Sequence, residues 1–311
     1  HSFPTRRSSD LGIEAAAVAG IVAGDAAKEL EVISHVEQED IEAMGTFLKE
    51  VPCSVCEASS DLIFDIQITL YHGEDNASVR ITDFHTNLVH VSRNGEILLA
   101  KEITGKEESA LADKSTLTIE KIFAFAKEVD LADVREVLER QVRYNMAIAE
   151  EGLCGNYGAN IGKVLLATYG DQDVKVRAKA MAAAGSDARM NGCELPVVIN
   201  SGSGNQGMTA SLPVVEYAKE YNKTEEELIR AVILSDLITI HQKSKIGRLS
   251  AFCGAISAGC GAAAGIAYLL GGDYDTIAHT LVNSLAIVSG IVCDGAKASC
   301  AGKIAAAVNA G

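Results

Sequence analysis

The hydrophobic pattern changes its period twice along the chain and so predicts three regions. Apolar residues between 12 and 49 recur at helical intervals, with a break at Gly24-Asp25. From 62 to 100 the period becomes two, which indicates half-buried strands. After the polar segment 101–114, helical spacing returns and continues through the second half of the chain.

The middle region predicts a small antiparallel sheet. Every second residue from Leu62 to Leu70 is apolar, which is typical of a strand with one buried face. A turn at Gly73 to Asn76 leads to a second strand from Val79 to Phe84. Asn94-Gly95 is a strong signal for a tight hairpin before another strand at Ile97 to Ala100.

The second half predicts closely packed helices. Thr224 and Glu227 form a capping box that opens one of them. The run from Leu249 to Gly272 is long enough to span a bilayer, but Ala and Gly dominate it and contribute little transfer energy. We therefore expect a buried core helix there, with a transmembrane span as the alternative.

Composition narrows the class of partner. The chain has 42 acidic and 27 basic residues, a formal charge of −15, and no basic cluster that would pair with phosphates. Nucleic acid and anionic membranes are therefore disfavoured, and a small molecule is the expected partner. Eight cysteines without a visible signal peptide predict a cytoplasmic protein whose thiols serve as ligands or small apolar filler.

The predicted fold class is α+β, with a small antiparallel β-sheet domain and a larger, mostly α-helical catalytic domain. Residues 1–11 resemble a translated sequencing adapter and are excluded from the fold. Residues 12–58 are then the helical remnant of a truncated N-terminal region, 59–105 the β domain and 115–311 the catalytic domain. The last residues are typical of an unfinished Ala-rich helix, so we expect a truncated C-terminus as well.

A glycine-rich segment, Asn200 to Gly207, is the first candidate for chemistry. It follows an apolar stretch and precedes a predicted helix, where successive backbone N–H groups can bind a carboxylate or phosphate. It lacks the Gly-Lys-Ser/Thr ending of a phosphate-binding loop and the pattern of a dinucleotide site. The candidate binding residues are Ser201, Gly202, Ser203, Gly204, Asn205 and Gln206.

Cysteines form the second candidate. Cys253 and Cys260 are seven residues apart, as are Cys293 and Cys300, so each pair can share one helix face. Such thiols either bind metal or fill space beside Gly and Ala, and the spacing does not decide between these roles. The lone Cys53-Ser-Val-Cys56 has no second pair at zinc-site spacing, which favours a role outside metal binding.

The remaining candidates are charged or polar residues, each with an ordinary alternative. His241 and two lysines that follow it either end a solvated helix or serve a substrate carboxylate or a proton transfer. Asp294 and Lys297 form either a simple ion pair or groups tuned by a metal beside Cys293. His85 and Thr86 lie in a turn that either satisfies its own backbone or contacts substrate.

Four motifs in order, SGSGNQG, HQKSKIGRLSAFCG, GCGAAAGIAYLLGG and CDGAKASCAGK, resemble the L-cysteine desulfidase family, which is related to the alpha chain of iron–sulfur L-serine dehydratase. The resemblance implies a PLP-independent elimination in which L-cysteine gives pyruvate, ammonia and hydrogen sulfide at a 4Fe-4S cluster. Dehydration of L-serine to pyruvate and ammonia is the alternative among enzymes. A non-catalytic carboxylate-binding protein is the alternative outside enzymes, and a homodimer is the assembly left open.

The resemblance also implies roles for single residues. Cys253 and Cys293 match the cluster cysteines of the C-terminal half, with Cys260 and Cys300 as alternates. The glycine-rich loop would hold the substrate carboxylate, and Lys297 or His241 would carry protons. The family's other cluster cysteine lies in an N-terminal segment that we expect this chain to lack, in which case the fragment itself is inactive.

Overall fold

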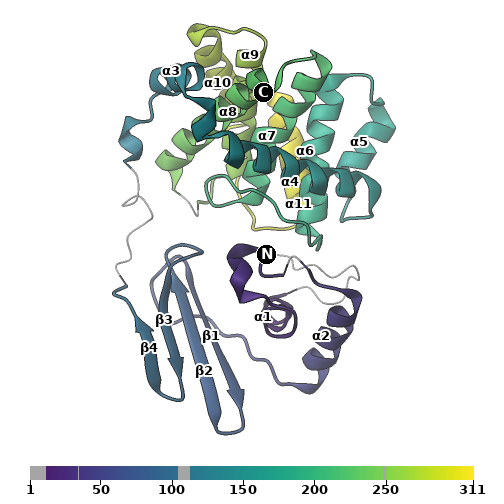
Figure 1. Cartoon of the computed structure of the whole chain (residues 1–311). Helices are drawn as coiled ribbons and strands as arrows, with labels where there is room; N and C mark the ends of the chain where they lie inside the picture. The colour runs from purple at the N-terminus through teal and green to yellow at the C-terminus, as the bar shows by residue number, and fades with distance from the viewer. Residues whose placement is uncertain (1–11, 34, 104–112, 248–249) are drawn as a thin grey trace. The chain divides into compact units, whose positions relative to one another are not determined.

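The computed structural model describes residues 12–311 apart from residues 34, 104–112 and 248–249. The chain divides into a helical unit, His1–Glu50 with Leu117–Gly311, and a sheet unit, Val51–Thr116, and each is described by itself. The predicted α+β class is confirmed, because one small antiparallel sheet accompanies many helices (Figure 1). Residues 1–11, set aside as adapter-like, lie outside the described residues.

The elements follow one another in a simple order. The α-helices are α1 (Ile13–Val22), α2 (Gln38–Glu50), α3 (Ile119–Glu128), α4 (Arg135–Cys154), α5 (Ile161–Tyr169), α6 (Val174–Met190), α7 (Gly204–Glu220), α8 (Glu225–Ile246), α9 (Gly254–Leu269), α10 (Tyr274–Val288) and α11 (Ser299–Ala310). The strands are β1 (Asp65–His72), β2 (Asp75–Thr82), β3 (Leu88–Arg93) and β4 (Glu96–Ala100), and short 3-10 turns occur at Ala26–Glu31, Lys114–Thr116 and Leu131–Asp133.

The sheet is a meander with the order β1-β2-β3-β4. The predicted hairpin at Asn94-Gly95 joins β3 to β4, and both residues have the positive φ that such a turn requires. β1 begins at Asp65, three residues after the predicted start at Leu62, and the Asp65–Arg80 ion pair joins its first residues to β2. The alternation continues beyond the paired backbone, which is why the pattern alone overestimates the strand.

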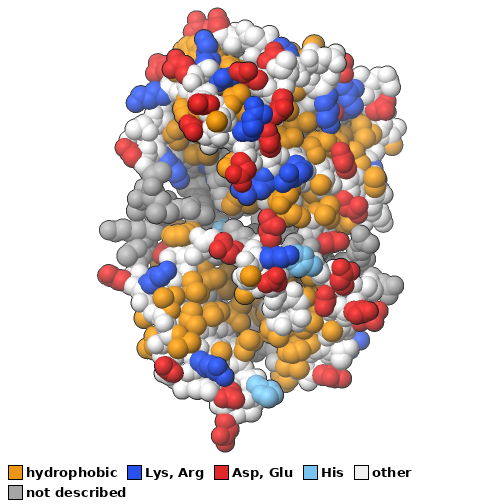
Figure 2. Space-filling view, in the orientation of Figure 1, with side chains coloured by type: hydrophobic (Ala, Val, Ile, Leu, Met, Phe, Trp, Pro, Cys, Tyr) orange, Lys and Arg blue, Asp and Glu red, His pale blue; other side chains and the backbone are white. Residues whose placement is uncertain are grey.

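One face of the sheet is apolar. Ile66, Ile68 and Leu70 in β1 lie opposite Ile81, Val79 and Ala77 in β2. These β1 side chains remain exposed within the described residues, and Figure 2 shows hydrophobic side chains gathered over the sheet. The opposite face carries polar residues, so the alternation of the sequence directly gives the two faces.

The core of the helical unit surrounds α9, which packs against α7, α8, α10 and α11. The expected buried helix is therefore confirmed, and no helix among the described residues is long and apolar enough to cross a membrane. Its small residues permit close packing: a Cβ at Gly261 would lie 2.5 Å from the Ser235 carbonyl oxygen on α8. Any larger residue would push α8 and α9 apart.

His241 and the two lysines that follow it lie on the last turns of α8. It begins with the predicted capping box, in which Thr224 and Glu227 exchange hydrogen bonds. It then continues beyond Ile240 to Ile246 and ends at Gly247, whose φ is 81°. The residues from His241 onward therefore form a helix end, as the sequence allows, with Lys243 and Lys245 in the last turn.

α1 and α2 pack on each other through a small core of their own, made of Val18, Ala19 and Met44. The predicted break at Gly24-Asp25 separates them, and Asp25 caps the short 3-10 turn that follows. The helical pattern of the first region is thus confirmed.

Candidate functional site

The glycine-rich loop is a tight turn followed at once by a helix. Asn200 and Ser203 exchange two backbone hydrogen bonds of 3.0 and 3.1 Å, and Ser201 and Gly202 between them have φ values of 49° and 83°. α7 begins at Gly204. The Ser203 side chain makes no capping hydrogen bond, so it leaves the first N–H groups of α7 to other acceptors.

Buried polar side chains hold this turn in place through hydrogen bonds. The Asn200 amide donates to the Asp236 carboxylate at 2.9 Å, and Gln141 donates to the same oxygen at 3.1 Å. Asn145 accepts from the Val198 N–H at 3.0 Å and so anchors the segment that enters the loop. Burial raises the pKa of Asp236 to about 6, although both amide donors lower it.

No motif singles out Asp236, Gln141 or Asn145, because each is one of several polar residues within its helix. Only the fold brings them beneath one turn. Their spacing in the chain carries no signal of this contact.

Cys253 and Cys293 lie on one face of a two-strand ribbon. Phe252 and Val292 pair in an isolated antiparallel bridge; the Cys253 N–H donates to Ile291 at 3.2 Å and the Cys293 N–H to Ala251 at 2.6 Å. The two cysteines are therefore diagonal neighbours on the same face.

Cys253 is also the N-cap residue of α9. Burial raises the pKa of its thiol, whereas a hydrogen bond from the Ala255 N–H lowers it. The thiols of Cys293 and Cys300 raise this pKa further, and Lys303 lowers it. The helix start thus gives Cys253 a partly compensated environment for a thiolate.

Two lysines place positive charge beside this cysteine pair. Lys243, near the end of α8, is only 4% exposed. Burial lowers the pKa of Lys243, while the thiols of Cys253 and Cys293 raise it. Lys303 on α11 pairs with Asp294 and donates to the Val292 carbonyl at 3.1 Å. A buried amine without a carboxylate partner is costly unless a negative group lies beside it.

The two alternate cysteines have different surroundings. Cys300, at the start of α11, is half-buried and its thiol contacts the Gly295 carbonyl at 3.7 Å. Cys260 is 1% exposed within the main core, and burial raises the pKa of its thiol to about 12. These surroundings support a packing role for Cys260.

Gln206 connects the loop to the cysteines. Its side chain lies against the backbone of Gly254, where a Cβ would approach the Gln206 amide carbon to 2.5 Å. Gly254 directly follows Cys253 and starts α9. The N-terminal ends of α7 and α9 therefore meet at this contact, and both carry the partial positive charge of a helix start.

Arg189 on α6 adds a further cation at the loop. A Cβ at Gly204 would lie 2.6 Å from the Arg189 Nε, and its guanidinium donates to the Asn205 side-chain oxygen at 3.3 Å. Burial lowers the pKa of Arg189, and the Cys300 thiol opposes that shift. Sequence reasoning missed this residue, since a single Arg in an Ala-rich helix is unremarkable by pattern.

The proton-transfer candidates differ in their surroundings. His241 is half-buried on α8, and its Nδ1 atom has no hydrogen-bond partner among the described residues. Lys297 is 54% exposed and pairs with Asp294 at 3.1 Å, which is the ordinary ion pair that the sequence allowed. Asp294 and Lys297 both precede α11, which starts at Ser299, so the two residues do not share a helical turn.

The remaining predicted residues belong to the sheet unit. His85 and Thr86 belong to the sheet unit, where the His85 ring contacts Phe64 with 5.0 Å between centroids. Cys53 and Cys56 are exposed. Within the described part of the chain, no three His, Cys, Asp or Glu side chains are grouped so that they could hold a metal ion by themselves.

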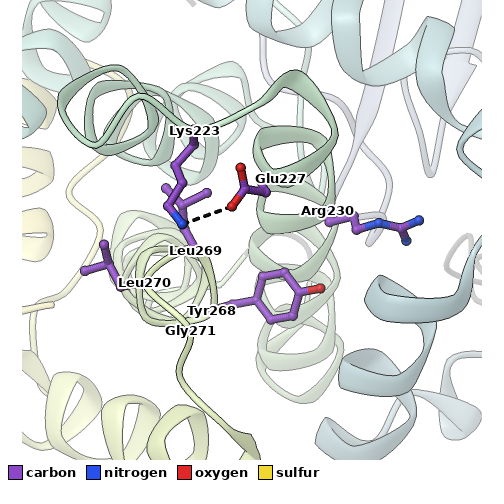
Figure 3. Close-up of a pocket in the computed structure, with 7 residues that line it drawn as sticks. All are labelled: Lys223, Glu227, Arg230, Tyr268, Leu269, Leu270 and Gly271. Atoms are coloured by element: carbon purple, nitrogen blue, oxygen red, sulfur yellow. Dashed lines mark hydrogen bonds and ion pairs between the residues drawn. The ribbon is translucent and has the colours of Figure 1, made fainter.

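A separate pocket of about 260 Å³ lies at the other end of α8 (Figure 3). Lys223 and Glu227 face each other there at 3.0 Å, and Arg230 binds the last carbonyls of α3. The charged groups of Lys223, Glu227 and Arg230 are thus already paired within the fold. From Glu227 to Lys243 the helix rises by roughly 24 Å, so this pocket is distinct from the cysteine cluster.

The chain is similar in sequence to a known protein family and to several bacterial proteins. The family described as serine dehydratase alpha chain matches residues 27–311. A UPF0597 protein from Desulfitobacterium hafniense is 61% identical over 300 residues, which cover 96% of this chain and 70% of that protein. UPF0597 proteins from Lachnoclostridium phytofermentans and Fusobacterium nucleatum are 52% and 44% identical, each over 96% of this chain and 71% of its own length. No solved structure matches.

Proposed function

Because the chain belongs to the serine dehydratase alpha chain family, we propose that it is a lyase that eliminates the β substituent of a small amino acid, with L-cysteine as substrate. One observation carries the proposal: Gln206 packs on Gly254, which brings an anion-binding helix start next to Cys253. A carboxylate site and a thiolate site are therefore adjacent. This adjacency is what a cluster-assisted elimination from an amino acid requires.

The donor set is suited to an iron–sulfur cluster, the group that the family implies. Thiolates are the usual ligands of such clusters, and Cys253 and Cys293 offer two on one face. Lys243 and Lys303 supply positive charge that balances an anionic cluster. When bound, a 4Fe-4S cluster would supply a Lewis-acidic iron for the leaving group. Two thiolates hold a cluster weakly, so a further ligand from outside this pair is needed.

The loop would bind the substrate carboxylate. The first N–H groups of α7 point away from their own helix, and Ser203 leaves them uncapped. The Ser203 hydroxyl and the Asn205 amide are the side-chain donors of this site. Arg189 raises the local positive potential, since its guanidinium lies against Gly204.

His241 is the base that the surroundings favour over Lys297. Elimination removes the proton from Cα, the Cα–H electron pair forms the Cα–Cβ double bond, and the Cβ–S bond breaks to release sulfide. The aminoacrylate product then hydrolyses to pyruvate and ammonia. The His241 Nδ1 atom, which has no partner in the part of the chain that the structure describes, can accept the proton, whereas the Lys297 ammonium is held by Asp294.

The family description favours a second candidate substrate, L-serine, which would lose water by the same steps. The test is anaerobic reconstitution of the chain with ferrous iron, sulfide and a small thiol that completes the ligand set. The longer Desulfitobacterium relative is assayed in parallel. Release of sulfide from L-cysteine supports the proposal, and pyruvate from L-serine alone replaces it with the second candidate. If both proteins bind iron but act on neither amino acid, the lyase assignment fails.

A further inference from the structure

We infer that Gln206 accepts a hydrogen bond from the substrate's α-ammonium group and so selects amino acids over acids that lack it. The inference rests on the proposed function, which it deepens by assigning the group that recognises the amine. The glycine-rich loop itself was expected to bind the carboxylate alone.

The first observation is an unsatisfied acceptor. Gln206 is 6% exposed, and its Oε1 atom has no hydrogen-bond partner among the residues that the structure describes. Buried side-chain polar atoms in proteins are almost always paired, because an unpaired one loses its hydration without compensation. A buried acceptor without a protein donor, on the helix that follows the proposed binding loop, is therefore a group that a donor on the ligand would satisfy.

The second observation is where this acceptor lies. Gln206 is the third residue of α7, and its amide is held against the Gly254 backbone, with 2.5 Å from a Cβ at position 254 to the amide carbon and nitrogen and 2.8 Å to the amide oxygen. Only glycine at 254 leaves room for it. The amide is thus held at the start of α9, against the residue that follows Cys253.

The two charged groups of an amino acid fit this spacing. An amino acid carries its carboxylate and its ammonium on the same carbon, so their partners must lie within a few ångströms of each other. The α7 N–H groups supply donors for the carboxylate, and the Gln206 oxygen is a neutral acceptor one turn away or less. Lys243 does not satisfy this oxygen, since the oxygen has no protein donor in the described residues.

The alternative is that Gln206 only fills space between α7 and α9. An apolar side chain of similar size would then serve equally well, since nothing would be lost on binding. The two roles differ in one measurable quantity, the preference of the site for an amino acid over the same acid without its amine.

The probes are L-alanine, which has no leaving group, and propionate, its counterpart without the amine. Their binding to the chain is followed by NMR titration in the wild type, Gln206→Leu and Gly254→Ala, with Gln172→Leu as the matched control at an exposed glutamine. Gln206→Leu removes the acceptor, whereas Gly254→Ala displaces it and leaves it in the chain. We expect both variants to reduce the preference for L-alanine about tenfold, with propionate binding unchanged in Gln206→Leu.

The outcomes are separable. Loss of preference in both variants, with wild-type preference in Gln172→Leu, supports the inference. A preference retained in Gln206→Leu with unchanged thermal unfolding overturns it, and equal binding of both probes by the wild type does so as well, while the lyase proposal stands. If the wild type binds neither probe, the proposed function fails first and this inference fails with it.

Discussion

Cys253 and Cys293 are diagonal neighbours on one face of a short antiparallel ribbon, although 40 residues separate them in the chain. The hydrogen bonds from their own N–H groups to Ile291 and Ala251 create this arrangement. Their backbones are thus tied to each other independently of any ligand. A preformed pair of thiols lowers the ordering cost of binding a cluster.

The loop assignment predicts a loss of substrate binding without a loss of metal. Asn205→Ala removes a side-chain donor and frees Arg189 from its 3.3 Å contact. Gly204→Leu places atoms where a Cβ already comes within 2.4 Å of Val197. We expect each variant to weaken binding of L-alanine about tenfold, the effect of one hydrogen bond to a charged group.

NMR titration measures the binding, and the iron content of the reconstituted protein is the control. Wild-type binding in both variants would show that the loop has a structural role only. Circular dichroism at matched concentrations excludes a general loss of fold in Gly204→Leu.

We predict that the ionisation of Asp236 makes the free energy of unfolding depend on pH. A carboxyl whose pKa is about 6 when folded and 3.8 when unfolded binds its proton more tightly in the folded state. Its ionisation therefore destabilises the fold above about pH 6, and the cost disappears as the pH falls toward 4. Asp236→Asn keeps an oxygen for Asn200 and Gln141, so we expect it to be more stable than the wild type at pH 8 by about 1–3 kcal/mol.

Urea unfolding at pH 8 and pH 4 measures this difference. Glu227→Gln is the control of opposite sign, because the backbone N–H of Thr224 lowers the pKa of Glu227 to about 2. That carboxylate stabilises the fold above about pH 4.5, and its removal should lower stability at pH 8. A wild-type profile in Asp236→Asn would refute the role given to burial.

We predict that replacing Lys243 raises the thermal stability of the metal-free chain and weakens its iron binding. Its ammonium is buried, and no ion pair joins it to a carboxylate of the described residues, so Lys243→Met should raise the midpoint of thermal unfolding of the metal-free chain by about 2–4 °C. The same change removes positive charge beside the thiols and should weaken iron binding about tenfold. Lys297→Met, at an exposed lysine, is the control.

Calorimetric scans and iron titration test both halves of this prediction. A variant that binds iron as well as the wild type would show that Lys243 does not balance the charge of the site. A destabilised metal-free variant would show that the amine has a partner that the charge argument overlooks.

Local signals in the sequence were sufficient for several elements. The Thr224 and Glu227 capping box, the Asn94-Gly95 hairpin and the buried helix after residue 249 follow from short-range rules that the structure obeys. The alternation in β1 predicts its two faces because side chains along a strand point to opposite sides. These features depend on neighbours in the chain.

The residues that the sequence pattern did not identify are those whose partners are distant in the chain. The polar residues from His241 onward do form a helix end, yet Lys243 is buried there beside cysteines from two later segments. Arg189 and Asp236 gave no signal because their partners lie elsewhere in the chain. The sequence pattern alone identified the loop, the cysteines and the lysines after His241, but not Arg189 and Asp236.

The central claim is that Cys253 and Cys293 bind iron at this site. The most direct measurement is iron per chain after anaerobic reconstitution with iron, sulfide and a small thiol, in the wild type, Cys253→Ser, Cys293→Ser and Cys260→Ala. A serine oxygen is a poorer ligand for cluster iron, so both serine variants should lose their iron, while Cys260→Ala keeps it and loses only some stability. Unchanged iron in both serine variants would contradict the account.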